Sequence, residues 1–308
     1  MLHPIPSNQH QHHDSGFSLP ELLVSLLVLS VIIGTVTQLS MTMSNGQRTM
    51  WNRTQMHSSV RGAIALLQQE VGQAGLVALP APVTLSGAVA LGTQTVTVSS
   101  AAGIFVGEQL VIGTGVPLET VTVTARNTTT NQITGVFTKT HAAGEPVSVL
   151  GGFAQGIIPP NMTNGSTATV LKLFGDVNDD GQMVYVEYTC SSTTGKLSRN
   201  MMSWTATSKP ALTSANVLLS NVVANPGGAA CFSYQTEVVS PNTYVVAIAV
   251  TLSVQTQDID PVTRQFQIET KTLLNVSPRN VFNTWQLASM QETNRIQPIP
   301  ASVLVLIQ

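Results

Sequence analysis

A single carboxylate, Glu21, lies near the start of a long apolar run and would need a counter-ion there. Residues 16–29 read GFSLPELLVSLLVL, and Glu21 is the only charged side chain from Phe17 to Gln47. An unpaired carboxylate at bilayer depth costs about 2.5–3.5 kcal/mol, so Glu21 needs a cation. Cleavage after Gly16 would create one, the α-amine of Phe17. That amine would lie about one helical turn from Glu21 in the same chain, and it would meet Glu21 directly between staggered chains.

The two cysteines, Cys190 and Cys231, form a second pair with possible chemistry. Each lies at the end or start of a β-rich run. An even number of cysteines in an exported domain favours a disulfide, and closing a loop of about 40 residues would contribute roughly 4 kcal/mol in the chain-entropy model. The alternative is two buried thiols.

An acidic turn has the spacing of an EF-hand loop, with Asp176, Asn178, Asp180 and, seven residues later, Glu187. The run MVYVEY alternates like a strand, which would carry Glu187 about 23 Å from Asp180 and argues against a full EF-hand. Two interpretations stay open. A calcium ion is held weakly by Asp176, Asn178 and Asp180, or the turn holds no ion, which we favour.

Nothing else in the sequence points to catalysis. No GxSxG, HExxH, CxxC or phosphate-loop motif occurs. Neither His57 nor His141 has a nucleophile linked to it in sequence, and a lone histidine in a turn, such as His141, is more often structural. We therefore expect no enzymatic activity and no cofactor.

A single long helix must position Glu21. Pro20 fits the first helical turn, where its missing N–H costs nothing. Residues 22–43 form an apolar stretch of about 33 Å, enough to span a bilayer. Beyond Met43 the pattern becomes amphipathic, and glycines end it. The apolar positions are Val60, Ile64, Leu67 and Val71, the polar ones are Arg53, Arg61, Gln68 and Glu70, and the terminating glycines are Gly72 and Gly75.

The motif GFSLPE followed by an apolar helix resembles the class III signal of type IV prepilins and type II secretion pseudopilins. The resemblance implies cleavage between Gly16 and Phe17 by a membrane prepilin peptidase and N-methylation of Phe17. It also implies that Glu21 pairs with the terminal amine of a neighbouring subunit during assembly. The run RTQMHSSVRGAIALLQQEVGQAGL, residues 53–76, resembles PilW-like minor pilins and J-type pseudopilins of type II secretion systems.

We therefore expect an α+β fold, in which a long N-terminal hydrophobic helix (the pilin spine) packs on an antiparallel β-sheet domain that carries an inserted small all-β module. The run SVLVLIQ at the end is either a terminal strand or an exposed sticky end. The expected parts are a leader peptide (1–16), the helix (17–76, with 17–43 transmembrane and 44–76 its periplasmic half), a linker (77–87), the inserted β-module (88–150), the pilin β-domain (151–282) and a C-terminal tail (283–308).

The implied function is structural. Only 9% of the 308 residues are charged and the net charge is −2, which argues against nucleic acid as a partner. The resemblance implies a minor pilin-like subunit that primes or caps assembly of a type IV pilus. The alternatives are a minor pseudopilin of a type II secretion system, a tip adhesin acting through residues 88–150, or a membrane-anchored enzyme. The implied partners are the prepilin peptidase, major and minor pilins, an inner-membrane assembly platform and the lipid bilayer. The implied location is the inner membrane, with a single pass and a periplasmic C-terminal domain, and later a pilus or pseudopilus at the cell surface.

Overall fold

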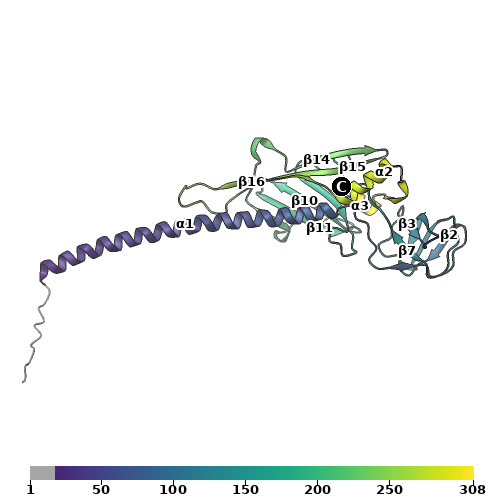
Figure 1. Cartoon of the computed structure of the whole chain (residues 1–308), viewed down its shortest axis with the longest axis horizontal. Coiled ribbons are helices and arrows are strands. Elements are labelled where there is room, and N and C mark those ends of the chain that lie inside the picture. Colours follow the sequence, from purple (N-terminus) through teal and green to yellow (C-terminus); the bar gives the residue numbers. More distant parts are fainter. Residues whose placement is uncertain (1–17) are drawn as a thin grey trace, which may run out of the picture.

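The computed structural model describes residues 18–308, and it consists of one long helix, a β-sheet body beside the second half of that helix, and a smaller β-module beyond its end (Figure 1). The expected α+β architecture, with antiparallel sheets following a long apolar helix, is confirmed.

Helix α1 (Leu19–Gln73) has 55 residues and is therefore about 82 Å long. Its first half is exposed, and its second half buries a stripe against the sheets. The helix ends close to the expected glycines. Gly75 has φ +83°, and a Cβ there would approach Val281 Cγ2 to 2.9 Å, so this exit from the helix requires glycine. The buried residues of the stripe are Met56, Val60, Ala63, Leu67, Glu70 and Val71.

Two antiparallel sheets form the body that covers the stripe. The first sheet has the order β12-β11-β10-β9, and in the second sheet β15 is central, with β13 and β14 on one side and β16 on the other. Helix α1 contacts β12, β15 and β16, so both sheets share one core with it. The strands are β9 (Val170–Gly175), β10 (Val184–Ser191), β11 (Lys196–Ser203), β12 (Val217–Ser220), β13 (Val222–Val223), β14 (Phe232–Val239), β15 (Asn242–Gln255) and β16 (Ile268–Val276).

The inserted β-module follows α1 directly and has its own core. Its two sheets have the orders β1-β7-β3-β4 and β2-β6-β5. The segment expected as a linker, 77–87, belongs partly to this module, because Val83 and Leu85 are buried in its core and β1 pairs with β7. The strands are β1 (Val83–Thr84), β2 (Gly92–Thr97), β3 (Gln109–Ile112), β4 (Glu119–Thr122), β5 (Ala125–Asn127), β6 (Gln132–Phe137) and β7 (Pro146–Val149).

The C-terminal segment differs from the expected extended tail. Helix α2 (Arg279–Ser289) crosses the expected boundary at residue 283, β17 (Ile296–Gln297) pairs in parallel with β8 (Gly152–Phe153), and α3 (Ala301–Ile307) is a helix rather than a strand. In α3 the buried residues are Val303, Leu306 and Ile307, which have helical and not alternating spacing. Short 3-10 turns occupy Ser214–Asn216, Pro226–Gly228 and Thr293–Arg295.

The β-module is attached firmly to the body through Gln297, a fully buried residue. Its side-chain amide accepts from Gln109 N at 2.9 Å and donates to Gln109 O at 2.9 Å and Leu150 O at 3.1 Å, as a neighbouring strand would. Phe105 of the module adds contacts with two aromatic rings of the body, Phe153 and Trp204, at centroid distances of 5.8 and 5.9 Å. The module is therefore docked on the body by both polar and aromatic contacts.

Candidate assembly site and its supporting networks

The first turn of α1 holds Glu21 at the start of the apolar stretch. Ser18 has an extended backbone before the helix, and its carbonyl accepts from the N–H groups of Glu21 and Leu22 at 3.0 and 3.1 Å. Pro20 occupies the first turn as expected. The Glu21 side chain is exposed and lies at the positive end of the helix dipole, which favours a carboxylate there. The residue is thus open to contact with another molecule.

The apolar stretch that follows is suited to lipid or to other helices. Its most apolar 18-residue window has a mean hydropathy of 2.3, and none of that window is buried within the chain. The hydroxyls of Ser25, Ser30 and Thr35 donate to backbone carbonyls three residues earlier at 2.8–2.9 Å, so they need no partner in a bilayer. A Cβ at Gly34 would meet nothing within 4 Å, so a neighbouring helix has free access to that face.

No lysine or arginine of this chain is close enough to neutralise Glu21. The first Lys or Arg of the sequence is Arg48, and α1 is continuous between the two residues, which places them about 40 Å apart. Within residues 18–308, none of the ion pairs includes Glu21. The expected processing residues, Gly16 and Phe17, lie outside the residues that the structure describes.

A buried network fixes the other end of α1 to the first sheet. Glu70 is fully buried, and it accepts hydrogen bonds from Tyr188 Oη at 2.5 Å and Arg199 Nε at 3.1 Å, with a further ion pair to the Arg199 guanidinium. Burial and the Glu70 carboxylate both raise the pKa of the Tyr188 phenol above its usual value. The assignment of Glu70 to the polar face of the helix was wrong. Its position three residues after Leu67, on the apolar stripe, was the signal in the sequence.

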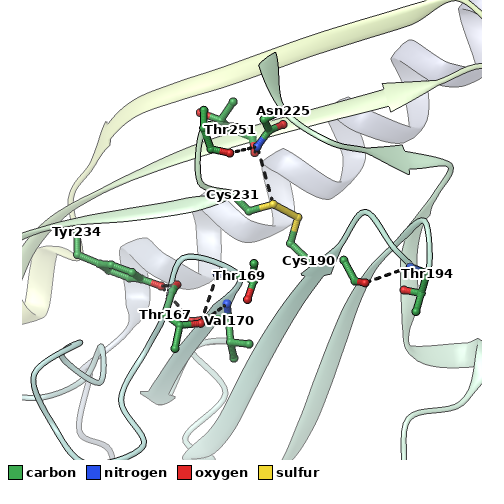
Figure 2. The surroundings of a disulfide bond; sticks show 11 residues. Thr167, Thr169, Val170, Cys190, Thr194, Asn225, Cys231, Tyr234 and Thr251 are labelled. Atoms are coloured by element: carbon green, nitrogen blue, oxygen red, sulfur yellow. Dashed lines mark hydrogen bonds between the residues drawn. A yellow bond between two sulfur atoms is a disulfide. The ribbon is translucent and has the colours of Figure 1, made fainter. Parts of the chain in front are cut away.

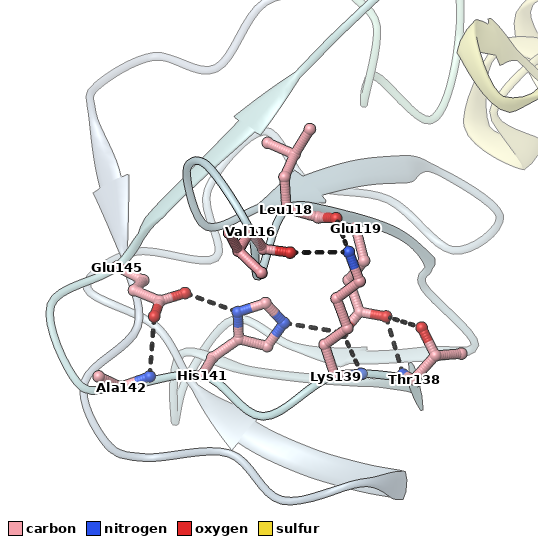
Figure 3. Close-up of polar contacts among 8 residues, drawn as sticks. All are labelled: Val116, Leu118, Glu119, Thr138, Lys139, His141, Ala142 and Glu145. Atoms are coloured by element: carbon pink, nitrogen blue, oxygen red, sulfur yellow. Dashed lines mark hydrogen bonds and ion pairs between the residues drawn. The ribbon is translucent and has the colours of Figure 1, made fainter.

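His141 is the centre of a second network, inside the β-module (Figure 3). Its Nε2 lies 2.7 Å from Glu119 Oε1 and its Nδ1 lies 2.6 Å from Glu145 Oε2, and the ring is fully buried. Because carboxylates only accept hydrogen bonds, the ring bonds to both only when both nitrogens carry protons. Burial opposes ionisation of Glu119, but hydrogen bonds from Thr138, His141 and Lys139 outweigh it and hold the pKa of this carboxyl below its usual value. His141 is therefore a cross-link between strands with no ring nitrogen left for a substrate.

A second buried carboxyl in the β-module, Glu108, has only one hydrogen-bond partner. Its Oε2 accepts from Phe105 N at 3.0 Å, while its Oε1 is buried with no hydrogen-bond partner. Burial raises the pKa of Glu108 to about 8, against smaller opposing effects of the Phe105 hydrogen bond and the charge of Arg126. The raised pKa favours the neutral form of Glu108 in the folded protein.

The two cysteines form the favoured disulfide, with an S–S distance of 2.03 Å (Figure 2). Cys190 is at the end of β10 and Cys231 precedes β14, so the bond joins the two sheets of the body. Asn225 lies beside it and donates to Thr251 O at 2.9 Å. The disulfide therefore links the first sheet covalently to the second.

The acidic turn uses its carboxylates on its own backbone. Asp176 accepts from the N–H groups of Asp180 and Gly181 at 3.0 and 2.8 Å, and Asp180 accepts from Gln182 N at 2.9 Å. Glu187 lies on β10 and pairs with Lys209 Nζ at 2.9 Å, away from the turn. Across residues 18–308 there is no group of three or more His, Cys, Asp or Glu side chains that could hold a metal ion. The geometry supports a hydrogen-bonded turn, with Asn178 exposed at its tip.

Comparison with known proteins yields a finding at the N-terminus. Residues 11–37 match the family described as the prokaryotic N-terminal methylation motif. No curated protein matches the chain. The matched residues include Gly16, Phe17 and Glu21, and the exposed helix that follows them has the length and composition of a membrane anchor. The motif implies processing by a prepilin peptidase and assembly with other pilins. The methylation motif and the exposed apolar helix together support a type IV pilin-like N-terminus, as the resemblance in the sequence implies.

Proposed function

We propose that the chain is a minor pilin-like structural subunit that primes or caps assembly of a type IV pilus. The observation that carries this proposal is the isolation of Glu21. It stands in an exposed apolar helix about 40 Å from the first Lys or Arg of its own chain. A neighbouring subunit that presents the α-amine of Phe17 supplies the missing cation, and pairing in a low dielectric fixes the register between subunits.

The position of the β-module supports a place at the end of a filament. The module lies beyond the C-terminal end of α1, opposite the apolar anchor (Figure 1). In a filament of parallel, staggered helices, this volume is where the next subunit body would stand. The contacts of Gln297 and Phe105 prevent the module from swinging aside. A subunit of this shape suits the first or last position better than repeated positions in a shaft.

The proposed life cycle follows from the same features. A prepilin peptidase cuts between Gly16 and Phe17, and Phe17 is N-methylated. The helix then spans the inner membrane once, with the body in the periplasm, where the disulfide between Cys190 and Cys231 is stable. An assembly platform transfers the subunit to a pilus at the cell surface, or to a pseudopilus if the system is a type II secretion system. This role requires neither catalysis nor a cofactor.

Adhesion through the β-module is a second candidate function. The module exposes large apolar side chains on its loops and on the solvent-facing side of β6, and Val116 is 91% exposed. Leu118 lies near Val116, and Val136 is also exposed. Such side chains suit contact with another surface. Changing Val116→Asn and Leu118→Ser tests this function, because loss of adhesion with normal piliation supports it, and unchanged adhesion contradicts it.

Glu21 provides the test of the main proposal. We expect Glu21→Gln and Glu21→Leu to reduce incorporation into sheared filaments more than tenfold, because both remove the charge that the neighbouring amine pairs with. Thr35→Val is the matched control, since it changes a polar residue of the same exposed helix. Immunoblots of sheared and membrane fractions measure incorporation, and the mass of the mature N-terminus measures cleavage. Unchanged incorporation of Glu21→Gln, with normal cleavage, would refute the pairing.

A further inference from the structure

The hairpin loop between β15 and β16 extends back along α1 toward the apolar stretch (Figure 1). The loop, residues 256–267, reaches the helix at Thr49, whose Oγ1 donates to Asp260 Oδ1 at 3.1 Å. Arg53 also bonds to Gln267 at the base of the loop. The tip of this loop therefore lies only about two turns of helix beyond Met43, where the apolar stretch ends.

The tip is held in one conformation by Asp260, which is buried. Its carboxylate accepts from the N–H groups of Val262 and Thr263 at 2.7 and 3.2 Å, and its backbone N–H donates to Gln265 O at 3.0 Å. These hydrogen bonds define the backbone of the loop and therefore determine which of its side chains face solvent.

Two of the exposed side chains of the loop, Ile259 and Val262, are apolar and stand among polar ones such as Asp258. We call Met50, Trp51, Ile259 and Val262 the membrane-proximal patch. Their exposed fractions are 72% for Met50 and Trp51, 53% for Ile259 and 67% for Val262. An open groove of about 830 Å³ runs between helix and loop, and it is lined by Ser44, Arg48, Trp51, Ile259 and Pro261 among others.

The patch lies at the depth of the lipid headgroups when residues 22–43 span the bilayer. The headgroup region extends about 5–7 Å beyond the hydrocarbon on each side. Ser44, which lines the groove with Ile259 and Pro261, directly follows the apolar stretch. Trp51 is eight residues, about 12 Å, beyond Met43, but helical side chains lean toward the N-terminus, which brings the indole back toward the bilayer. Tryptophan with flanking arginine is the composition found at membrane interfaces.

We propose that the membrane-proximal patch rests on the phospholipid headgroup layer while the subunit waits in the membrane, so that the sheet body stands at a fixed depth and tilt before assembly. The inference rests on the proposed membrane anchoring through residues 22–43. Continuity of the patch with the anchor favours lipid as the occupant, because the bilayer must meet the helix at Ser44. The guanidinium of Arg48 at the same level pairs with lipid phosphate.

Nitroxide labels test the proposal in the full-length chain. The two cysteines of the chain are joined in a disulfide, so a single introduced cysteine can be labelled selectively. The test variant is Val262→Cys. The matched control is Val238→Cys, also a valine, which is 69% exposed on β14, where it pairs with Thr243 at the start of β15. Thr35→Cys reports whether the anchor itself is in lipid. Each variant is placed in nanodiscs of phosphatidylcholine and phosphatidylglycerol at one chain per disc, and collision with oxygen is compared with collision with a nickel chelate.

We expect the label at 35 to favour oxygen, the label at 238 to favour the nickel chelate, and the label at 262 to fall between them, as a position in the headgroup layer should. A label at 262 that behaves like the label at 238, with 35 in lipid, would overturn this inference alone. Spin–spin broadening at 262 only in discs with two chains, with 262 in water in single-chain discs, would assign the patch to a second copy and also overturn it. A label at 35 in water would remove the anchoring on which both proposals depend.

Discussion

Replacement of Glu70 by alanine should loosen the attachment of α1 to its sheets. Glu70 is fully buried, and the change removes its ion pair with Arg199 and its hydrogen bond from Tyr188. Removing one partner of a buried pair costs about 3–5 kcal/mol. The Arg199 side chain is 18% exposed, so its guanidinium regains some hydration, and we expect the lower end, about 3 kcal/mol.

Thermal unfolding of the full-length chain in detergent measures this loss. For a body of this size, 1 kcal/mol corresponds to about 2–4 °C, so Glu70→Ala should lower the Tm by about 6–12 °C. Arg199→Ala and the double variant complete a mutant cycle, in which the double variant loses less than the sum of the single variants because the two residues contact each other.

The matched control is Gln69→Ala, a change at the exposed neighbour of Glu70, which should alter the free energy of unfolding by less than about 0.5 kcal/mol. Equal Tm values for Glu70→Ala and Gln69→Ala would refute the reasoning, since the buried network would then contribute nothing to the attachment. An additive mutant cycle would show that Glu70 and Arg199 act separately.

Three further predictions concern the disulfide and the β-module. Replacing Cys190 and Cys231 together by serine should lower the free energy of unfolding by about 4 kcal/mol, because the 41-residue loop is no longer closed in the unfolded chain; urea titration measures it. His141→Gln should speed amide hydrogen exchange at least tenfold in residues 83–149 while leaving β9–β16 unchanged, because two carboxylates lose the ring that bonds to both of them. Glu108→Gln should have little effect near pH 4.5 but stabilise the protein by about 3 kcal/mol at pH 7, measured as the difference between the two stability–pH curves.

The sign of the Glu108 prediction follows from linkage. The folded pKa of about 8 lies above the ordinary 4.5, so the unfolded chain releases its proton first as the pH rises, and folding loses stability from about pH 4.5 until pH 8. Glutamine keeps the acceptor for Phe105 and removes this loss. A difference between wild type and variant that is constant with pH would contradict the prediction. For His141→Gln, equally fast exchange in the body would contradict a role confined to the module.

The elements with strong local patterns could be predicted from the sequence. The apolar stretch and Pro20 predict α1. Runs with partial period-two alternation at 181–190, 244–257 and 264–276 predict β10, β15 and β16. In the module, the β-rich runs 108–113, 132–138 and 146–150 predict β3, β6 and β7. The strands β9, β12 and β13 were missed, because two to six residues between turns carry little pattern. The C-terminal run SVLVLIQ was ambiguous, since a short apolar run fits strand and helix equally until its packing partners are known.

The polar networks show why the candidate sites were only partly predictable. The position of Glu70 on the apolar stripe indicates that it is buried, but nothing local identifies Arg199, which is 129 residues away, as its partner. His141 was expected to be structural, yet its partners Glu119 and Glu145 depend on the pairing of strands in the module. These contacts depend on the register of strand pairing between distant segments, which cannot be inferred from a single sequence.

The two carboxylates of α1, Glu70 and Glu21, differ in where a counter-ion is available to them. Glu70 finds its cation within the chain, because the sheet body lies against that half of the helix. Glu21 lies 49 residues earlier, about 74 Å away along continuous helix, and the hydrogen bonds of that helix prevent it from folding back to the Lys and Arg residues of the body. Under the proposed processing, its charge would be balanced near the helix N-terminus, by a terminal amine of its own or of a neighbouring chain. Changes at Glu70 should alter unfolding without a direct effect on subunit register, whereas changes at Glu21 should alter incorporation without a measurable effect on the body.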